Sequence, residues 1–511
     1  MEQYTQQEVP EELGVLSFKT PEQGKDEIRL DRRTERRIRR QYEREVKRQR
    51  VSYIPGPRYD VGGAKRPHNF RGGLGVKGKA RRATSFTVAS AYPFVASGSL
   101  GVPGVCMGSD KSGGGGFFFD PWELYRAKVI KGMAMVVIGS VGVGKSTVVK
   151  SLVSRLVLAG RRALIMSDKK GEWAIVADFL GGKTITVGPG IGNRINPLEE
   201  GQRPSTDSQG RPMTDRTWTT MVRSRRLSLL RGIVQILLDR RISVSEDKAI
   251  RESLDAAVVQ AATEGRVPVI TDVMAHLRNP DAELISEQRS RDAYGEMSDA
   301  MSRMVEGDLE GMFDGESTVE LDATAPIIVF NTQALEGVSE EARKITYACT
   351  QSWAEAVVTS RDFGQRVMVY EEGLDALSDP GSLQRMVAQW KLARAYGIFN
   401  VLVLHKLKDL NMAGDEGTKT REQALSLLGD SDIRVVYHQN TDQMVETREA
   451  LGLTARECEK VAGFREGYGL WKLGDASFVV QNIMTGPERP IFNTDKQMDV
   501  AEPTEAEPSL T

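Results

Sequence analysis

Short hydrophobic runs alternate with amphipathic segments through most of the chain. A short apolar run predicts a buried strand, and apolar residues spaced three and four positions apart predict a helix. We expect strands at 133–138, 162–168, 184–187, 325–330, 366–370, 399–404 and 433–439, with helices at 146–159, 217–238, 245–263, 340–360 and 384–395. Because a strand followed by a helix usually leads to a second, parallel strand, the pattern predicts an α/β fold with a mostly parallel central sheet.

The pattern changes in three parts of the chain. Residues 216–315 have helical spacing almost throughout, which predicts an all-α insertion at about 200–320 inside the α/β domain. Residues 1–82 and the acidic residues 499–511 are polar, so we expect both to be disordered and the folded domain to span 83–498. Within that domain, Gly113–Gly116 is expected to be a flexible link and Trp122 a core residue rather than a ribose or base contact.

A glycine-rich loop follows the strand predicted at 133–138. Residues Gly139 to Ser146 fit the pattern G-x-x-x-x-G-K-[ST] of phosphate-binding loops, and a predicted helix follows. The glycines let backbone N–H groups turn onto phosphates, and the helix N-terminus adds partial positive charge. We therefore predict that a nucleoside triphosphate binds to Gly139, Ser140, Val141, Gly142, Val143, Gly144, Lys145, Ser146 and Thr147.

Two side chains of this loop have the chemistry of phosphoryl transfer. Lys145 is expected to reach the β- and γ-phosphates, and the hydroxyl of Ser146 is expected to bind Mg²⁺. The predicted cofactors are therefore ATP and Mg²⁺.

Carboxylates follow two of the other predicted strands. Glu371 and Glu372 end the strand at 366–370, and we assign Glu371 to the metal and Glu372 to activation of the attacking water. Asp168 and Glu172 follow the strand at 162–168. Ligands of open α/β sheets bind at the carboxyl ends of the strands, so both are expected to point toward the same region.

Two further residues are candidates for roles at the γ-phosphate. His405 follows the strand at 399–404, and a polar residue at the tip of the strand beside the loop strand can sense the γ-phosphate; the alternative is a surface histidine. Arg394 ends the preceding helix, and we expect it on the same side of the sheet as His405. In a ring of subunits Arg394 is a candidate arginine finger that acts in trans; the alternative is a surface salt bridge.

Charge is unevenly distributed along the 511 residues. Residues 31–82 hold 18 Lys and Arg against 5 Asp and Glu, a local charge of +13, so the net charge of −1 leaves −14 on the rest of the chain. A basic arm of this kind binds nucleic acid or an anionic membrane surface, or docks on an acidic partner. The sequence leaves these three choices open.

Cysteine usage and hydropathy bear on the compartment. The three cysteines lie far apart and do not cluster with the four histidines, which argues against a disulfide framework or a zinc site. The polar, acidic N-terminus does not have the pattern of a signal peptide, and no apolar run reaches about 18 residues. We therefore expect a cytoplasmic protein, with a peripheral position at the inner face of the cell membrane left open.

Taken in order, these motifs resemble those of the conjugative and type IV secretion ATPases of the TraC-like, VirB type in their actinobacterial form, within the FtsK/HerA class of RecA-like P-loop motors. The resemblance spans about Ala91 to Met498 and rests on the segments 100–104, 119–125, 139–147, 168–172, 196–198, 371–372, 394–405 and 494–495. The chain departs from the family pattern D-P-K-G-E-Y at Asp168-Lys-Lys-Gly-Glu-Trp173, and it has Glu371 where Asp is usual.

The resemblance implies a RecA-like P-loop NTPase fold of the ASCE type and ATP hydrolysis by a cytoplasmic, hexameric ATPase that energises a secretion channel. It also implies that Arg394 matches the trans-acting arginine of the family and that His405 matches its sensor, usually glutamine. Two alternatives remain. One is a DNA translocase of the FtsK/HerA kind, in which the basic arm guides DNA. The other is an ATP-binding scaffold with low turnover, which Glu371 suggests.

Overall fold

The computed structural model describes Arg40 and residues 100–492, apart from 208–209, 320–321, 359–363, 372–379 and 408–418. The chain divides into two compact units, 1–82 and 83–511, and the elements below belong to the second. Arg40 apart, several predictions therefore lie outside the described residues: the basic arm 31–82, the water-activating Glu372, Thr494 and Asp495, and the acidic tail 499–511.

A single sheet of 11 strands organises the described part of the chain. Its order is β2-β1-β11-β10-β9-β3-β8-β7-β4-β6-β5. The bounds are β1 Val105–Asp110, β2 Gly116–Phe119, β3 Ala134–Ile138, β4 Arg162–Asp168, β5 Lys183–Thr186, β6 Ile327–Asn331, β7 Arg366–Tyr370, β8 Ile398–Leu404, β9 Ile433–Val436, β10 Tyr468–Leu473 and β11 Ala476–Asn482. From β9 to β5 every neighbouring pair is parallel, which confirms the predicted mostly parallel sheet.

The register of the parallel strands brings their carboxyl ends to one edge of the sheet. Ile138, the last residue of β3, pairs with Leu404 of β8 and with Val436 of β9, and Tyr370 of β7 pairs with Leu402. β8 therefore lies between β3, which precedes the glycine-rich loop, and β7, which precedes Glu371. Every residue of β3, β7 and β8 is buried, as expected for strands covered on both faces.

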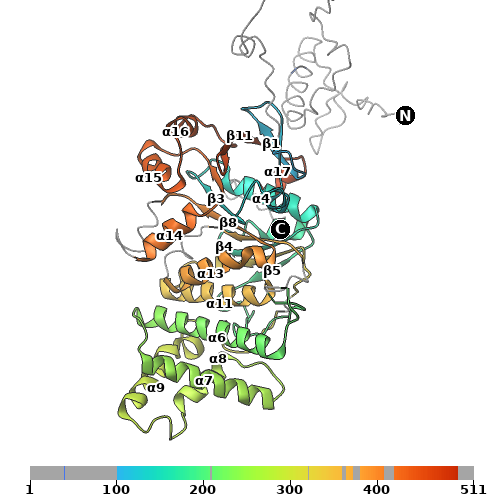
Figure 1. Cartoon of the computed structure of the whole chain (residues 1–511). Coiled ribbons are helices and arrows are strands. Elements are labelled where there is room, and N and C mark those ends of the chain that lie inside the picture. The colour runs from blue at the N-terminus through green and yellow to red at the C-terminus, as the bar shows by residue number, and fades with distance from the viewer. Residues whose placement is uncertain are drawn as a thin grey trace, which may run out of the picture. The chain divides into compact units, whose positions relative to one another are not determined.

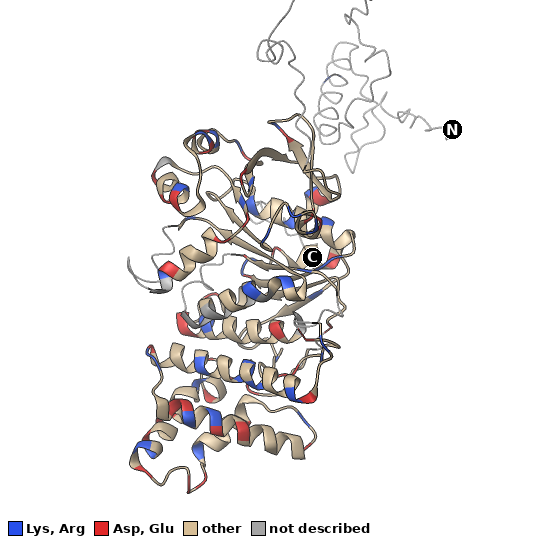
Figure 2. Ribbon diagram, viewed as in Figure 1, with Lys and Arg blue, Asp and Glu red and all other residues tan. Residues whose placement is uncertain are grey.

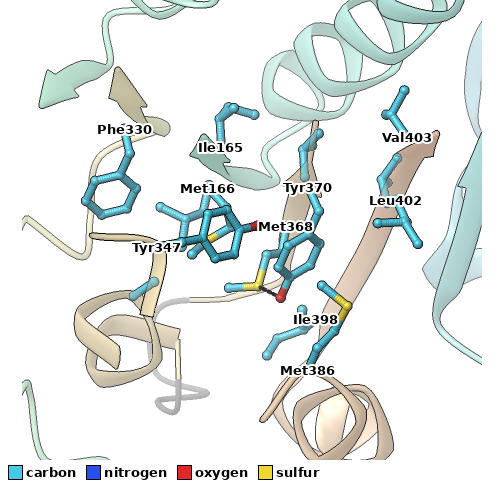
Figure 3. Packing of buried hydrophobic residues seen from close by; sticks show 14 of the residues in the cluster. Ile165, Met166, Phe330, Tyr347, Met368, Tyr370, Met386, Ile398, Leu402 and Val403 are labelled. Atoms are coloured by element: carbon cyan, nitrogen blue, oxygen red, sulfur yellow. Dashed lines mark hydrogen bonds between the residues drawn. The ribbon is translucent and has the colours of Figure 1, made fainter. Parts of the chain in front are cut away.

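Helices cover both faces of the parallel strands. Figure 1 shows α4 (Lys145–Leu158) on one face, and α11 (Glu340–Val358) and α13 (Pro380–Tyr396) on the other. Side chains from the sheet and from α11 and α13 meet in the core, among them Met166, Met368, Tyr347 and Met386 (Figure 3). Among the described residues, no helix combines the length and hydrophobicity needed to cross a bilayer.

The antiparallel end of the sheet was only partly predicted. β10 and β11 form a hairpin, and β1 and β2 form another. The expectation of a flexible link at Gly113–Gly116 is wrong, because these residues make the turn between β1 and β2 and the first residue of β2. The carboxylate of Asp110 accepts hydrogen bonds from the backbone N–H groups of Ser112 (2.8 Å) and Gly113 (3.0 Å) and so closes a tight turn. Trp122 is a core residue, as expected, and its ring meets that of Phe399 edge-on at 6.1 Å.

A helical layer lies between β5 and β6 in the sequence. It contains α6 (Asp215–Leu238), α7 (Val244–Thr263), α8 (Ile270–Arg278), α9 (Gln288–Met301) and α10 (Arg303–Glu306), and α6 packs against α11. These helices carry charged residues of both signs, interspersed (Figure 2). The layer falls within residues 200–320, where the sequence predicts an insertion.

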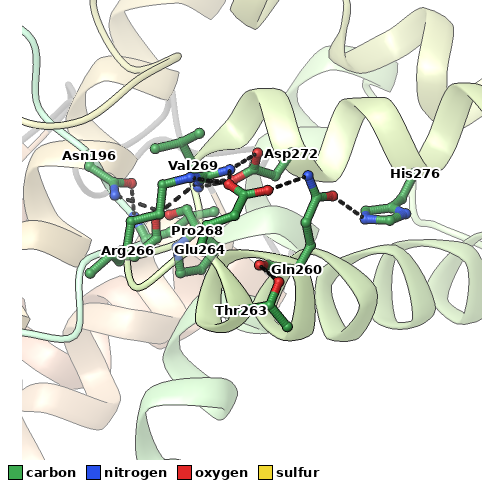
Figure 4. A network of polar contacts seen from close by, with 11 residues as sticks. Asn196, Gln260, Thr263, Glu264, Arg266, Pro268, Val269, Asp272 and His276 are labelled. Atoms are coloured by element: carbon green, nitrogen blue, oxygen red, sulfur yellow. Dashed lines mark hydrogen bonds and ion pairs between the residues drawn. The ribbon is translucent and has the colours of Figure 1, made fainter.

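Polar contacts fix this layer to the α/β core at residues 196–200. Asn196 donates a side-chain hydrogen bond to the Pro268 carbonyl (3.0 Å), and the buried Arg226 of α6 donates to the Leu198 carbonyl (2.6 Å). The start of α8 is held by Asp272, which accepts two hydrogen bonds from Arg266 and one from the N–H of Val269 (Figure 4). Burial raises the pKa of Asp272, but these hydrogen bonds outweigh burial, and its pKa is lowered overall.

A buried ion pair fastens α4 to the outer part of the sheet. The side chains of Arg155 and Glu488 are 11% and 7% exposed and form two hydrogen bonds, of 2.7 and 2.5 Å. The same guanidinium donates to the carbonyls of Ile483 (2.6 Å) and Cys106. One side chain of α4 thus joins β1, the end of β11 and α17 (Glu488–Phe492).

We expect Arg155→Ala to lower the free energy of unfolding by about 3–5 kcal/mol, because the Glu488 carboxylate is left buried without its partner. Urea unfolding followed by circular dichroism measures this change. The matched control is Arg126→Ala, which removes an arginine that is 68% exposed and pairs with Glu123, and which costs at most about 1 kcal/mol. The double variant Arg155→Met/Glu488→Leu should recover much of the loss. Equal costs for the two alanine variants would contradict this role for the Arg155 ion pair.

Candidate nucleotide-binding site

The glycine-rich loop connects β3 to α4 at the carboxyl edge of the sheet. Gly142 and Gly144 have positive φ angles of 77° and 98°, in the left-handed region that favours glycine. A Cβ at Gly139 would lie 2.6 Å from the Cβ of Tyr437, so the loop passes too close to the end of β9 for any side chain there. Two backbone hydrogen bonds, from Ser140 N to the His438 carbonyl and from Gly467 N to the Val143 carbonyl, fix the loop from outside.

The start of α4 is suited to binding an anion. Gly144 is the N-cap and supplies no side chain to the first N–H groups of the helix, and the first turn contains no acidic residue. These N–H groups and the positive end of the helix dipole therefore remain available to phosphate oxygens. Lys145 is 4% exposed, and its ammonium group donates to the Ser140 carbonyl at 2.6 Å, across the mouth of the loop.

A cleft in front of the loop brings together residues from three neighbouring strands. Its walls come from α4, from the segment after β4, and from the ends of β7 and β8: Ser146, Ser167, Asp168, Lys169, Lys170, Glu172, Glu371, Val403 and His405. The structure thus gathers four residues that the sequence placed near the site, namely Asp168, Glu172, Glu371 and His405. Their chemical roles remain predictions.

Glu371, the predicted magnesium ligand, lies in this cleft. Its carboxylate accepts a hydrogen bond from the indole N–H of Trp173, and Ser146 lines the same cleft. Burial raises the pKa of Glu371, while the Trp173 hydrogen bond, the charge of Lys150 and the nearby Ser146 hydroxyl lower it, and the net shift is upward. One hydroxyl and one carboxylate side by side fit Mg²⁺, which binds few protein groups and takes its other ligands from phosphates and water. Ser146 and Glu371 are the residues that would hold it.

The segment 168–173 forms a second acidic wall of the cleft. Asp168 accepts hydrogen bonds from the backbone N–H groups of Trp173 (2.7 Å) and Glu172 (3.0 Å), yet burial dominates and raises its pKa. Glu172 pairs with Lys150 at 2.7 Å, and the side chain of Lys150 is only 1% exposed. The positive charge of Lys150 therefore offsets the repulsion among the neighbouring carboxylates of Asp168, Glu172 and Glu371.

Sequence reasoning missed Lys150 and the indole contact of Trp173. Lys150 stands among Val148, Val149 and Leu152 on the buried part of α4, and a lysine at such a position needs an anionic partner. That mismatch was the available signal for Lys150. For Trp173 no local signal exists, because its partner Glu371 lies 198 residues away.

Arg394 lies at the opposite edge of the sheet from the cleft. It is exposed in the last turn of α13, and the following Gly397 carbonyl accepts from the N–H of Arg366, the first residue of β7, at 3.1 Å. The expectation that Arg394 lies on the same side of the sheet as His405 is therefore wrong. A helix that links parallel strands runs antiparallel to them, so α13 ends at the edge where β8 begins. The seven residues of β8 then separate Arg394 from His405 by about 23 Å. Arg394 does not reach the cleft of its own subunit.

Comparison with protein-family models and with curated proteins finds no match. Among solved structures, VirB4 of Thermoanaerobacter pseudethanolicus aligns with a TM-score of 0.62 at 19% identity, over 77% of this chain and 100% of that chain. The bacterial conjugative coupling protein TrwB aligns less closely in its unbound form, with a TM-score of 0.45 at 14% identity, over 69% of this chain and 85% of that one. The complex of TrwB with ADP and Mg²⁺ has a TM-score of 0.43 at 15% identity, over 69% and 86%. The chain therefore has the predicted RecA-like P-loop fold and shares this fold with VirB4.

Proposed function

We propose that this protein is an ATP-hydrolysing motor of a conjugative or type IV secretion system, which energises substrate transfer or pilus assembly. The observation that carries the proposal is that Ser146 of the glycine-rich loop and Glu371, which follows a strand two places away in the sheet, line one cleft. This arrangement supports a site in which a loop with the phosphate-binding pattern and a carboxylate act together on a metal-bound triphosphate. Similarity of fold to VirB4 and the order of motifs support the secretion context.

The residues of the cleft have distinct roles in this proposal. Backbone N–H groups of residues 139–147 bind the phosphates, and Lys145 moves from the Ser140 carbonyl to the β- and γ-phosphates. Bound Mg²⁺ neutralises developing charge on the phosphate oxygens. Glu372 orients the attacking water, and His405 contacts the γ-phosphate at the tip of β8.

Assembly follows from the position of Arg394. An arginine at the amino edge can complete a cleft at the carboxyl edge only when unlike surfaces of two copies meet. We propose that these head-to-tail contacts close into a homohexameric ring. Its proposed place is the cytoplasmic face of the membrane, on channel components of the secretion system, with the basic arm 31–82 as a possible contact for DNA.

Steady-state ATPase assays with and without DNA test the proposal. We expect ATP turnover by the wild type, and a loss of turnover with retained ATP binding in Glu372→Gln, because the attacking water then lacks its carboxylate. Wild-type turnover no higher than that of the variant would indicate a low-turnover scaffold instead.

DNA addition separates the two motor classes. DNA stimulation at both low and high salt that disappears when Arg36, Arg37, Arg39 and Arg40 are changed to Gln would indicate an FtsK/HerA-like translocase. ATP turnover that does not respond to DNA is the result expected for a motor that moves protein. The matched control changes four arginines of the helical layer, Arg216, Arg223, Arg289 and Arg291, to Gln.

A further inference from the structure

A second pocket opens beside the nucleotide cleft, at the carboxyl ends of β4 and β6. Its volume is about 390 Å³, within the range of small-ligand sites. It is lined by Ser167, Lys169, Lys170, Thr332, Gln333, Leu335, Glu336, Arg343, Thr346 and Tyr347. The segment 168–172 separates the pocket from the cleft, so that Ser167, Lys169 and Lys170 contribute to both.

The chain geometry holds this dividing segment in place. The Thr332 N–H donates to the Asp168 carbonyl (3.0 Å), and the hydroxyls of Ser167 and Thr332 lie 2.9 Å apart. Gly171 has φ +69°, and a Cβ there would lie 2.8 Å from the Gln333 side chain. The nucleotide cleft and the second pocket are therefore neighbours that share the packed segment 168–172 as a wall.

The lining of the pocket favours an anion. Three cationic side chains, those of Lys169, Lys170 and Arg343, face a single carboxylate, that of Glu336. The hydroxyl groups of the lining add hydrogen-bond donors, a combination that suits phosphate oxygens.

We propose that this pocket binds inorganic phosphate as it leaves the nucleotide cleft. The inference rests on the proposed function, which supplies the ligand. In hydrolysis the water oxygen forms a bond to the γ-phosphorus, the bond to the β–γ bridging oxygen breaks, ADP keeps that oxygen, and one proton is released with the phosphate. The product anion appears beside Lys169 and Lys170, whose side chains also line the second pocket, and it meets Arg343 farther along.

Product inhibition tests the proposal through Arg343, because Arg343 lines the pocket but not the nucleotide cleft. We expect Arg343→Gln to keep the KM for ATP and the initial rate without added phosphate, and to raise the inhibition constant of inorganic phosphate about fivefold, the size of one exposed charge contact. The matched control is Lys344→Gln, which removes the same charge from the next residue of α11, outside the pocket. It should leave phosphate inhibition unchanged.

Calorimetric titration of inorganic phosphate into the ADP-saturated protein gives a second readout that does not need turnover. Weaker phosphate binding in Arg343→Gln than in Lys344→Gln is expected. Equal binding and equal inhibition in both variants and the wild type overturn the proposal. So does an effect of Arg343→Gln on oligonucleotide binding with none on phosphate, which would assign the pocket to a nucleic-acid backbone. If the wild type hydrolyses no ATP, the proposed function fails, and the titration still decides whether the pocket binds phosphate.

Discussion

Replacing Lys145 by alanine should lower the rate of ATP hydrolysis by about 10²–10³-fold, the usual cost of removing one preorganised charge from a transferring phosphoryl group. Lys145 is buried at the start of α4, and its ammonium group lies at the mouth of the loop. No other described side chain of residues 139–147 carries a charge. In the variant, the loop itself stabilises the charge on the β- and γ-phosphates through backbone groups alone.

A coupled phosphate-release assay measures the rate, and a thermal melt shows whether the variant is folded. The matched control is Lys131→Ala, an exposed lysine just before β3, which should change the rate less than twofold. Turnover by folded Lys145→Ala within twofold of the wild-type rate would contradict the assignment of residues 139–147 as the catalytic loop.

Arg394→Ala should lower turnover by about 10³-fold or more while ATP binding is kept, if Arg394 acts as an arginine finger. Its side chain is exposed at the amino edge of the sheet, so the substitution should leave the fold intact and should not change the loop that binds ATP. Lys391→Ala, also exposed and one turn earlier in α13, is the matched control. Weakened ATP binding in Arg394→Ala would refute a role in trans.

Mixing two inactive variants tests the trans role directly. The Arg394→Ala chain keeps an intact loop, and the Lys145→Ala chain keeps Arg394. An assembly that contains both chains therefore regains complete sites, each with the loop of an Arg394→Ala chain and the arginine of a neighbouring Lys145→Ala chain. With random mixing at equal amounts, about one quarter of the clefts pair an intact loop with a neighbour's arginine across a head-to-tail interface. Activity near that fraction is expected. No recovery in assemblies shown to contain both chains would place the function of Arg394 within its own subunit.

The elements predicted best are those whose signal is local. The strand predicted at 162–168 coincides with β4, because its apolar run ends abruptly at Gly160 on one side and Asp168 on the other. A helix cap depends equally on local residues: the hydroxyl of Thr454 accepts a hydrogen bond from the N–H of Glu457, three residues later, within a capping box. The short strand β2 was not predicted, because the glycine run 113–116, whose last residue begins β2, suggested flexibility, and pairing with β1 decided otherwise.

By itself the sequence determined the glycine-rich loop with its phosphate-binding pattern, the order of strands and helices, and the carboxylates that follow two strands. Each of these depends on neighbours within a few residues, through glycine conformation, apolar period or helix capping. Only the tertiary structure decided which strand ends share an edge. It placed β8 between β3 and β7, set Arg394 about a strand length from the cleft, and brought Lys150, Trp173 and Arg343 to positions beside residues far away in sequence. The distances between these residues depend on strand order and helix direction, which a pattern within a few neighbouring residues does not predict.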